Sequence, residues 1–125
     1  MIYTRIYSDD GGKTHFADGE IRLNEVAYAP PAPPFLVSDT AKAEAVMMTT
    51  LPAGWVGDWH PSPRLQWWVQ LAGEVEVEVG DGEKRRFAAG SIVRLEDTAG
   101  HGHVTRVLGS EDVSAVYVQL PDERR

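Results

Sequence analysis

The sequence predicts an all-β domain, an antiparallel sandwich or barrel, on three observations. The segment EVEVEVG at residues 74–80 alternates without error between glutamate and valine, which is the period of two that suits a half-buried strand. Gly-containing turns separate it from other short segments rich in β-branched and aromatic residues. Helical periodicity does not recur along the chain. Short strands joined by such turns are typical of antiparallel sandwiches and barrels.

The expected strands can be assigned in chain order. They fall at residues 21–28, 44–51, 65–73, 74–80, 83–87, 91–96, 103–108 and 113–120. A hairpin turn is expected at GDG, residues 80–82, because Gly and Asp tolerate the positive φ that such turns require. The four prolines of APPAPPF, residues 29–35, exclude a helix or a central strand. We expect this segment to run as an extended arm over the barrel, either as a plain connector or as a cover for a ligand mouth or a neighbouring subunit.

Length and composition restrict the function. The 125 residues suffice for one domain, with an N-terminal arm at about 1–43, which includes the Pro-rich segment 29–34, and a barrel core at about 44–120. A net charge of −7 argues against a nucleic-acid partner. The absence of cysteine excludes a disulfide framework and a thiolate metal site. No apolar run approaches the roughly 20 residues of a membrane helix, so we expect no membrane partner and a cytoplasmic protein.

Two segments carry the spacing of a known motif pair. In the first, Gly54 is followed by five residues, His60, one residue, Ser62, three residues, Gln66, six residues and Gly73. The second, GSIVRLEDTAGHGHVTRV, begins at Gly90 and offers His101 or His103. We favour His103, because it directly precedes the strand pattern VTRVL, whereas His101 lies between two glycines.

With this spacing the chain resembles the cupin family, as a small single-domain, bacterial-type member. The resemblance implies a jelly-roll barrel, also called a double-stranded β-helix, with a metal site inside it. The family binds its divalent metal through two histidines and a glutamate of the first motif and a histidine of the second. Here Ser62 and Gln66 occupy two of those positions, and only His60 and His103 keep the family's ligand type. The metal-binding motif is therefore degenerate.

Side-chain alternation predicts what the barrel interior contains. If Gln66 points inward, Trp68 and Gln70 do so as well, while Leu65, Trp67, Val69 and Leu71 face outward. This apolar outward face predicts packing against another layer or a homodimer. We also expect Trp68→Ala to weaken ligand binding more than folding, and Trp67→Ala to do the reverse. The inward set mixes polar and aromatic groups that suit a small organic ligand, and comprises His60, Ser62, Gln66, Trp68, Gln70 and His103.

The donor types at these positions make a metal-free site the first expectation. Serine is a poor ligand and Gln66 offers only a neutral oxygen, so no cofactor is expected. A divalent metal on His60, His103 and Gln66 remains the alternative, with Asp58 and Asp97 as reserve carboxylates. The simpler interpretation of both aspartates is that they bond turn backbone.

Three functions follow from this site. The first is metal-independent acid–base catalysis by a cyclase, isomerase or lyase, in which His60 and His103 move protons and Gln66 donates to a developing oxyanion. In it Ser62, Trp68 and Gln70 bind the substrate. The second is a metal-dependent oxygenase or isomerase that uses Fe, Mn, Ni or Zn. The third is a ligand-binding module without turnover.

Overall fold

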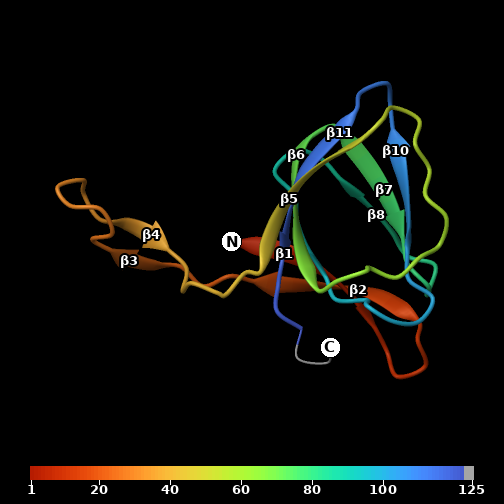
Figure 1. Ribbon diagram of the computed structural model, residues 1–125, viewed down its shortest axis with the longest axis horizontal. Coiled ribbons are helices and arrows are strands. Elements are labelled where there is room, and N and C mark those ends of the chain that lie inside the picture. Colours follow the sequence, from red (N-terminus) through yellow and green to blue (C-terminus); the bar gives the residue numbers. More distant parts are fainter. Residues whose placement is uncertain (123–125) are drawn as a thin grey trace.

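The computed structural model describes residues 1–122 and contains eleven strands (Figure 1). No helix is present among those residues, so none could cross a membrane. The predicted all-β class is confirmed. In chain order the strands are β1 (Ile2–Ser8), β2 (Thr14–Glu20), β3 (Asn24–Val26), β4 (Phe35–Val37), β5 (Ala45–Leu51), β6 (Gln66–Ala72), β7 (Glu74–Glu78), β8 (Lys84–Phe87), β9 (Ile92–Leu95), β10 (Val104–Leu108) and β11 (Val113–Gln119).

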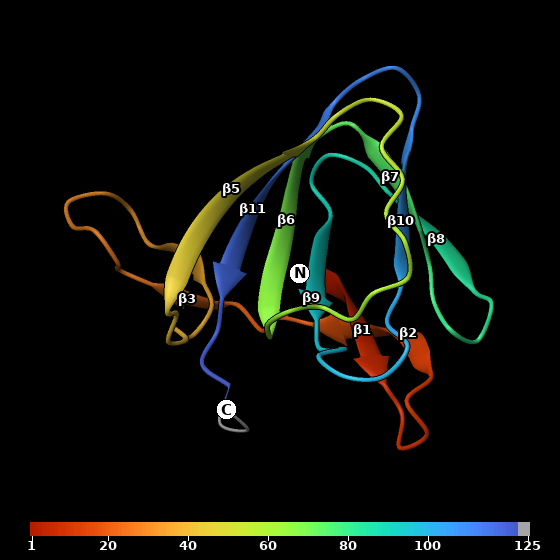
Figure 2. The ribbon, with the colours of Figure 1, turned by 45° about the vertical axis from the view of Figure 1, so that its right-hand side comes forward.

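Two sheets form the barrel. The larger has the order β2-β1-β9-β6-β11-β5 and the smaller the order β10-β7-β8. All neighbouring strands are antiparallel except β1 and β9, which run parallel. Figure 2 shows the two sheets facing each other, with β7, β8 and β10 opposite β5, β11, β6 and β9. The non-sequential strand order of the large sheet is what a jelly roll requires.

Strand β7 shows why the sequence pattern predicts the core. Val75 and Val77 are fully buried, and Val79 follows them inward. The glutamates between them face outward and pair with arginines of the two neighbouring strands, as in the 3.1 Å contact of Arg106 with Glu78. The alternation therefore separates an apolar core from a charged, solvated face.

The N-terminal residues belong partly to the barrel, which corrects the predicted arm at residues 1–43. Strands β1 and β2 form a hairpin in which Ile6 lies opposite Phe16, and both side chains are buried in the core. Strand β1 then pairs with β9 of the large sheet. These strands lack the strict alternation seen at residues 74–80, although β1 is rich in the Ile, Tyr and Thr that strands favour. The remaining barrel strands run from Ala45 to Gln119, within the range predicted for the core.

The true arm is a short hairpin made of β3 and β4. The strand expected at residues 21–28 is limited to Asn24–Val26, and the Pro-rich segment forms the hairpin's connection. Figure 1 shows the hairpin projecting away from the barrel, at the left of the view. The expectation that this segment runs over the barrel is therefore wrong, because the flanking residues pair with each other instead.

His15 joins two turns at one end of the barrel. Its Nε2 lies 2.8 Å from Asp9 Oδ2 and its Nδ1 lies 2.9 Å from Asp81 Oδ2. Hydrogen bonds to Asp9 and then to Asp81 raise the pKa of His15 above its usual value. The bond to His15 is the main cause of the lowered pKa of Asp9, whereas a backbone hydrogen bond from Glu83 contributes most to the lowered pKa of Asp81.

This triad predicts a pH-dependent contribution to stability. A raised histidine pKa stabilises the fold fully below the unfolded value, near 6.5, and the effect is lost as pH rises through the folded pKa. The lowered aspartate pKa values stabilise it above about 4. We expect the stability difference between the natural protein and the His15→Gln variant to be largest between about pH 5 and 6 and to shrink toward pH 9. Urea unfolding across this range measures it, and a pH-independent difference would contradict the charged triad.

Candidate functional site

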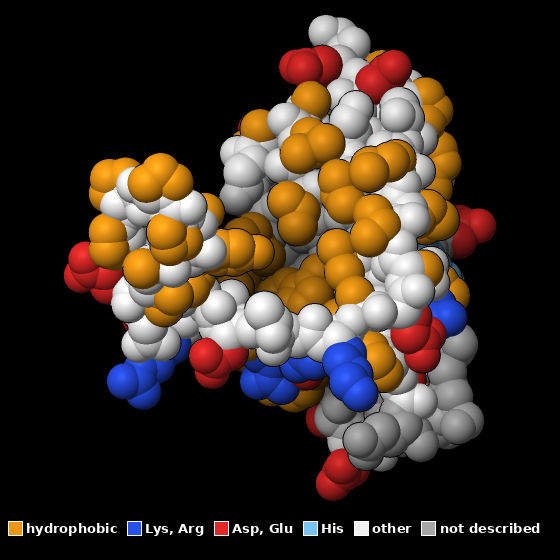
Figure 3. All heavy atoms as spheres, turned by 60° about the vertical axis from the view of Figure 1, so that its left-hand side comes forward, with side chains coloured by type: hydrophobic (Ala, Val, Ile, Leu, Met, Phe, Trp, Pro, Cys, Tyr) orange, Lys and Arg blue, Asp and Glu red, His pale blue; other side chains and the backbone are white. Residues whose placement is uncertain are grey.

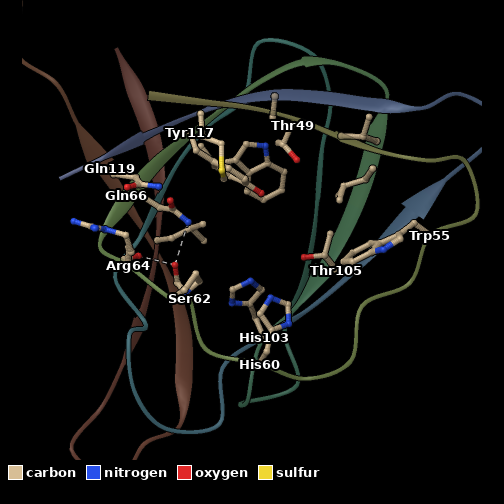
Figure 4. Close-up of a pocket in the computed structure, with 17 residues that line it drawn as sticks. Thr49, Trp55, His60, Ser62, Arg64, Gln66, His103, Thr105, Tyr117 and Gln119 are labelled. Carbon is tan, nitrogen blue, oxygen red and sulfur yellow. Dashed lines mark hydrogen bonds between the residues drawn. The ribbon is translucent and has the colours of Figure 1, made fainter. Parts of the chain in front are cut away.

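A cavity of about 530 Å³ lies between the two sheets (Figure 4). Its size falls within the range of small-molecule sites. It opens to solvent beside His60 and Met47, which line it and are exposed. The described lining residues are Met47, Thr49, Leu51, Trp55, His60, Ser62, Pro63, Arg64, Gln66, Trp68, Leu95, His103, Thr105, Val113, Ala115, Tyr117 and Gln119.

The segment between β5 and β6 brings His60 to the cavity. It runs antiparallel to β10 as an irregular added strand, held by the backbone bonds from Gly57 N to Thr105 O and from Val107 N to Trp55 O. His60 and His103 exchange two further backbone bonds, of 3.1 and 3.0 Å. The two histidines, distant in the sequence, are therefore fixed side by side by main-chain pairing.

Gly102 makes this pairing possible. Its φ is +76°, and a Cβ atom built on it would lie 2.0 Å from the carbonyl oxygen of His60. Backbone cannot move away as a flexible side chain could. The Gly102→Ala variant therefore combines an unfavourable φ with a clash in the wall of the cavity.

We expect Gly102→Ala to lower the free energy of unfolding by about 1–3 kcal/mol more than Gly109→Ala. Gly109 is a matched control because its φ is +72° and a Cβ atom there would meet nothing within 4 Å. The control isolates the cost of the left-handed backbone, about 1–2 kcal/mol. Urea denaturation of both variants measures the difference. Equal losses would mean that the His60 segment does not lie against Gly102.

His103 is held by a buried carboxylate. Its Nδ1 lies 2.6 Å from Asp97 Oδ2, and the two side chains are 5% and 0% exposed. A carboxylate oxygen accepts a hydrogen bond, so this contact directs Nδ1–H of His103 toward Asp97 and leaves Nε2 for a ligand. The second carboxylate oxygen of Asp97 is buried and has no hydrogen-bond partner in the described chain.

His60 has the same tautomer for a different reason. Its Nδ1 lies 2.7 Å from the backbone oxygen of Asp58, which can only accept, so Nδ1 donates and Nε2 is left for a ligand. The two rings lie 5.0 Å apart between centroids, with 52° between their planes. His60 is exposed where His103 is buried. One imidazole therefore faces solvent and the other an enclosed site.

Polar groups from β6 and the preceding segment line a second side of the cavity. Ser62 Oγ donates to the backbone oxygen of Arg64 at 2.6 Å, and Gln66 Nε2 lies 3.4 Å from Ser62 Oγ. Arg64 pairs with Glu44 near the surface. Figure 4 places Gln66, Ser62 and Arg64 together, to one side of the two histidines. Ser62 and Gln66 are buried, so a ligand that reaches them is desolvated.

Aromatic side chains line other parts of the cavity, and Figure 4 shows Tyr117 across it from the two histidines and Trp55 beside Thr105. Trp68 is 4% exposed and packs edge-on against Phe87, with ring centroids 5.7 Å apart. Tyr117 lies opposite Trp68 in the strand register of β11 and β6. Burial raises the pKa of Tyr117 above its usual value, so its hydroxyl stays protonated and can donate a hydrogen bond.

The structure brings together five of the six residues singled out as inward-facing. His60, Ser62, Gln66, Trp68 and His103 all line the cavity. Gln70 does not: its amide is buried elsewhere in the barrel and donates to the backbone oxygens of Gly73 and Phe87. Its inward direction follows from the alternation, but its hydrogen bonds are accepted by the turn after β6 and by the end of β8.

Some residues of the candidate site do not follow from the sequence pattern. Asp97 is expected from the sequence to bond turn backbone or to be a reserve metal ligand, whereas its side chain contacts His103 Nδ1. Asp58 acts through its backbone oxygen. Thr49 and Tyr117 lie on predicted strands, and the alternation could have shown their common face had the neighbouring strands been known. His101, the alternative to His103, is exposed and does not line the cavity.

Comparison with known proteins resolves the fold. No protein-family model matches the chain, and no curated protein matches it. Among solved structures, the cupin domain of Cnp3 from Schizosaccharomyces pombe matches 87% of this chain and 73% of its own, with 15% sequence identity and a TM-score of 0.53. The protein has a cupin fold. A conserved protein of unknown function from Streptococcus pyogenes, SPY1581, is 18% identical over 68% of this chain and 71% of its own, with a TM-score of 0.47.

The metal site that the cupin resemblance implies can be tested against the donors that this chain offers. Only two of the four ligand positions of the cupin motifs hold an imidazole. The Ser62 hydroxyl donates its hydrogen bond to a backbone oxygen. No acidic side chain lines the cavity within residues 1–122, and no group of three or more His, Asp or Glu there could hold a metal ion. Asp97 is already bonded to His103. Two neutral imidazoles and neutral oxygens do not fit a tightly bound divalent cation.

Proposed function

We propose that this cupin is a metal-independent acid–base enzyme that acts on a small organic molecule inside the barrel, as an isomerase, cyclase or lyase. The observation that carries the proposal is the buried Asp97–His103 pair, 2.6 Å apart, beside a second imidazole. A carboxylate behind a histidine orients the ring and offsets the charge that appears when Nε2 takes a proton. The cytoplasmic location stays a prediction.

The cavity favours a flat, uncharged or weakly anionic substrate. Trp68 offers an aromatic surface, and Leu51, Leu95 and Val113 add apolar area. Donors surround this area: the Gln66 amide, the Tyr117 hydroxyl and two threonines. A carbonyl or phenolic compound would use both kinds of contact.

The proposed reaction moves one proton in each direction. Nε2 of His103 removes a proton from a carbon next to a carbonyl, and the electron pair moves onto the carbonyl oxygen. The Gln66 amide donates a hydrogen bond to that oxygen, which an ionised glutamate could not do. His60, protonated by solvent at Nε2, gives this proton to a second carbon that is conjugated with the enolate, while the electron pair returns from the oxygen and the double bond shifts. The proton on His103 then passes to the exposed His60, whose ring centroid lies 5.0 Å away, and both rings are restored.

A substrate screen in heavy water tests the proposal. Small carbonyl and phenolic compounds are screened by thermal shift against the natural protein and the Thr49→Phe variant, which fills the cavity from β5. Thr50→Phe is the matched control, because the next residue on a strand faces the other way. Compounds that bind the natural protein and the control but not Thr49→Phe are incubated in D₂O, and carbon-bound deuterium is followed by NMR.

Deuterium incorporation or turnover that persists in the presence of a chelator is the expected result. Binding without exchange or turnover would assign the protein to the non-catalytic ligand-binding class instead. Activity that is lost on chelation and restored by one divalent ion would favour the metal-dependent alternative on His60, Gln66 and His103.

A further inference from the structure

The β3–β4 hairpin has an apolar surface that nothing in the described chain covers. Val26 lies opposite Phe35 in the hairpin register, and Tyr28 stacks on Phe35 with 5.9 Å between ring centroids. Val26, Tyr28 and Phe35 are 42%, 67% and 47% exposed. Strands β3 and β4 pack mainly against each other. Because an isolated two-stranded hairpin is marginally stable in water, this one needs a surface to pack on.

The barrel offers such a surface on the outside of its large sheet. Two cross-strand rows of three residues each, taken from β5, β11 and β6, carry apolar side chains on this face: Val46, Val118 and Trp67 in one, and Met48, Val116 and Val69 in the other. The exposed fraction reaches 60% at Val46 and 71% at Met48, on the edge strand. We call these six residues the outer patch.

Figure 3 shows the hairpin standing beside this face, with hydrophobic side chains on both and a hollow between them. The chain exposes 7557 Å² in all. A folded monomer of 13.8 kDa is expected to expose about 6,600 Å², so this chain exposes about 900 Å² more. A stable interface buries about 800 Å² per partner, which is close to that excess.

We propose that two copies of this chain form a symmetric dimer in which the hairpin of each copy packs on the outer patch of the other. A second copy fits because the chain carries both halves of the contact, a projecting apolar hairpin and an apolar sheet face. A two-fold axis repeats the contact and closes the assembly. Each hairpin then packs on a sheet face, which it lacks in the single chain. Strand β5, the exposed edge of the sheet, is covered.

Light scattering after size exclusion tests the assembly. We expect the natural protein to have twice the mass of its 13.8 kDa chain at micromolar concentration. Met48→Glu on the outer patch and Tyr28→Lys on the hairpin should each raise the dimer dissociation constant at least about tenfold, because each places a charge in an apolar contact. Both side chains are largely exposed in the single chain, so folding should be kept. Val56→Glu, at a residue 62% exposed and outside both surfaces, is the matched control.

Cross-linking then tests which surfaces meet. Because the chain has no cysteine, Tyr28→Cys and Met48→Cys each introduce a single thiol. We expect an oxidised mixture of the two variants to form a disulfide between copies, and each variant alone to form much less.

Three results would overturn the proposal. The first is a monomer at all concentrations, including one that binds phosphatidylcholine vesicles through this face. The second is a dimer that both charged variants leave intact. The third is a cross-link within one chain when Tyr28→Cys and Met48→Cys are combined.

Discussion

Replacing His103 with glutamine is expected to lower the turnover of any substrate found by the screen by about 10²–10⁴-fold, the usual contribution of a general base. Glutamine can still donate to Asp97, but it cannot accept a proton from carbon. Asp97→Asn should cause a loss of similar order while His103 stays in place. The asparagine amide would donate to Nδ1, so the ring proton would move to Nε2, the atom that must accept.

The matched control is His101→Gln, two residues away and exposed outside the cavity. It should keep full turnover. Melting temperatures of all three variants are measured with the kinetics, so that a folding defect is recognised. If Asp97→Asn were as active as the natural protein, the carboxylate would only support the fold, and the proposed role of the pair would be wrong.

Trp68→Ala is expected to lower the free energy of unfolding by about 3–5 kcal/mol, the range for a buried aromatic side chain replaced by alanine. Trp68 belongs to the core cluster and packs on Phe87, so its loss leaves a hole in the barrel as well as in the cavity. With both variants made in the Met48→Glu background, in which the outer patch stays exposed, Trp67→Ala should cost less, roughly 1–2 kcal/mol, because Trp67 is only half-buried, between Tyr3 and Arg94 on the outer face. Urea unfolding followed by circular dichroism measures both.

This order reverses the one expected from the sequence. The alternation correctly separated the directions of Trp67 and Trp68, but it could not tell how much of each ring is covered. The inward ring meets the opposite sheet, whereas the outward ring meets solvent along much of its edge. A larger loss for Trp67→Ala than for Trp68→Ala would mean that the outer face is more deeply buried than the single chain shows.

The sequence predicted the fold where a face is fully buried. The valines of β7 show a clear period of two because only apolar side chains fit at the core positions of this strand. The β1–β2 hairpin gave no such signal, since only a few of its residues, such as Ile6 and Phe16, are fully covered. The hairpin of β3 and β4 could not be foreseen as a projection, because its apolar residues look like those of a core strand.

The site was predictable to the extent that it follows strand alternation. Motif spacing located His60 and Gln66, and the strand after His103 distinguished it from His101. Asp97 lies in an irregular turn, where no period fixes its direction, so only the tertiary structure reveals its contact with His103. Gln70 was misplaced because alternation fixes a direction but not the depth at which a side chain finds partners.

Strand β5 separates the cavity on one side from the outer patch on the other. Met47, Thr49 and Leu51 line the cavity, while Val46 and Met48 belong to the outer patch, and β11 is its only strand neighbour among residues 1–122. A molecule in the cavity and a second copy on the outer patch would thus both restrain the same edge strand, from opposite sides. Free energy linkage then requires reciprocity: whatever factor the ligand adds to association, association adds to ligand affinity. If both bind as proposed, the apparent affinity of the cavity for its ligand would depend on protein concentration.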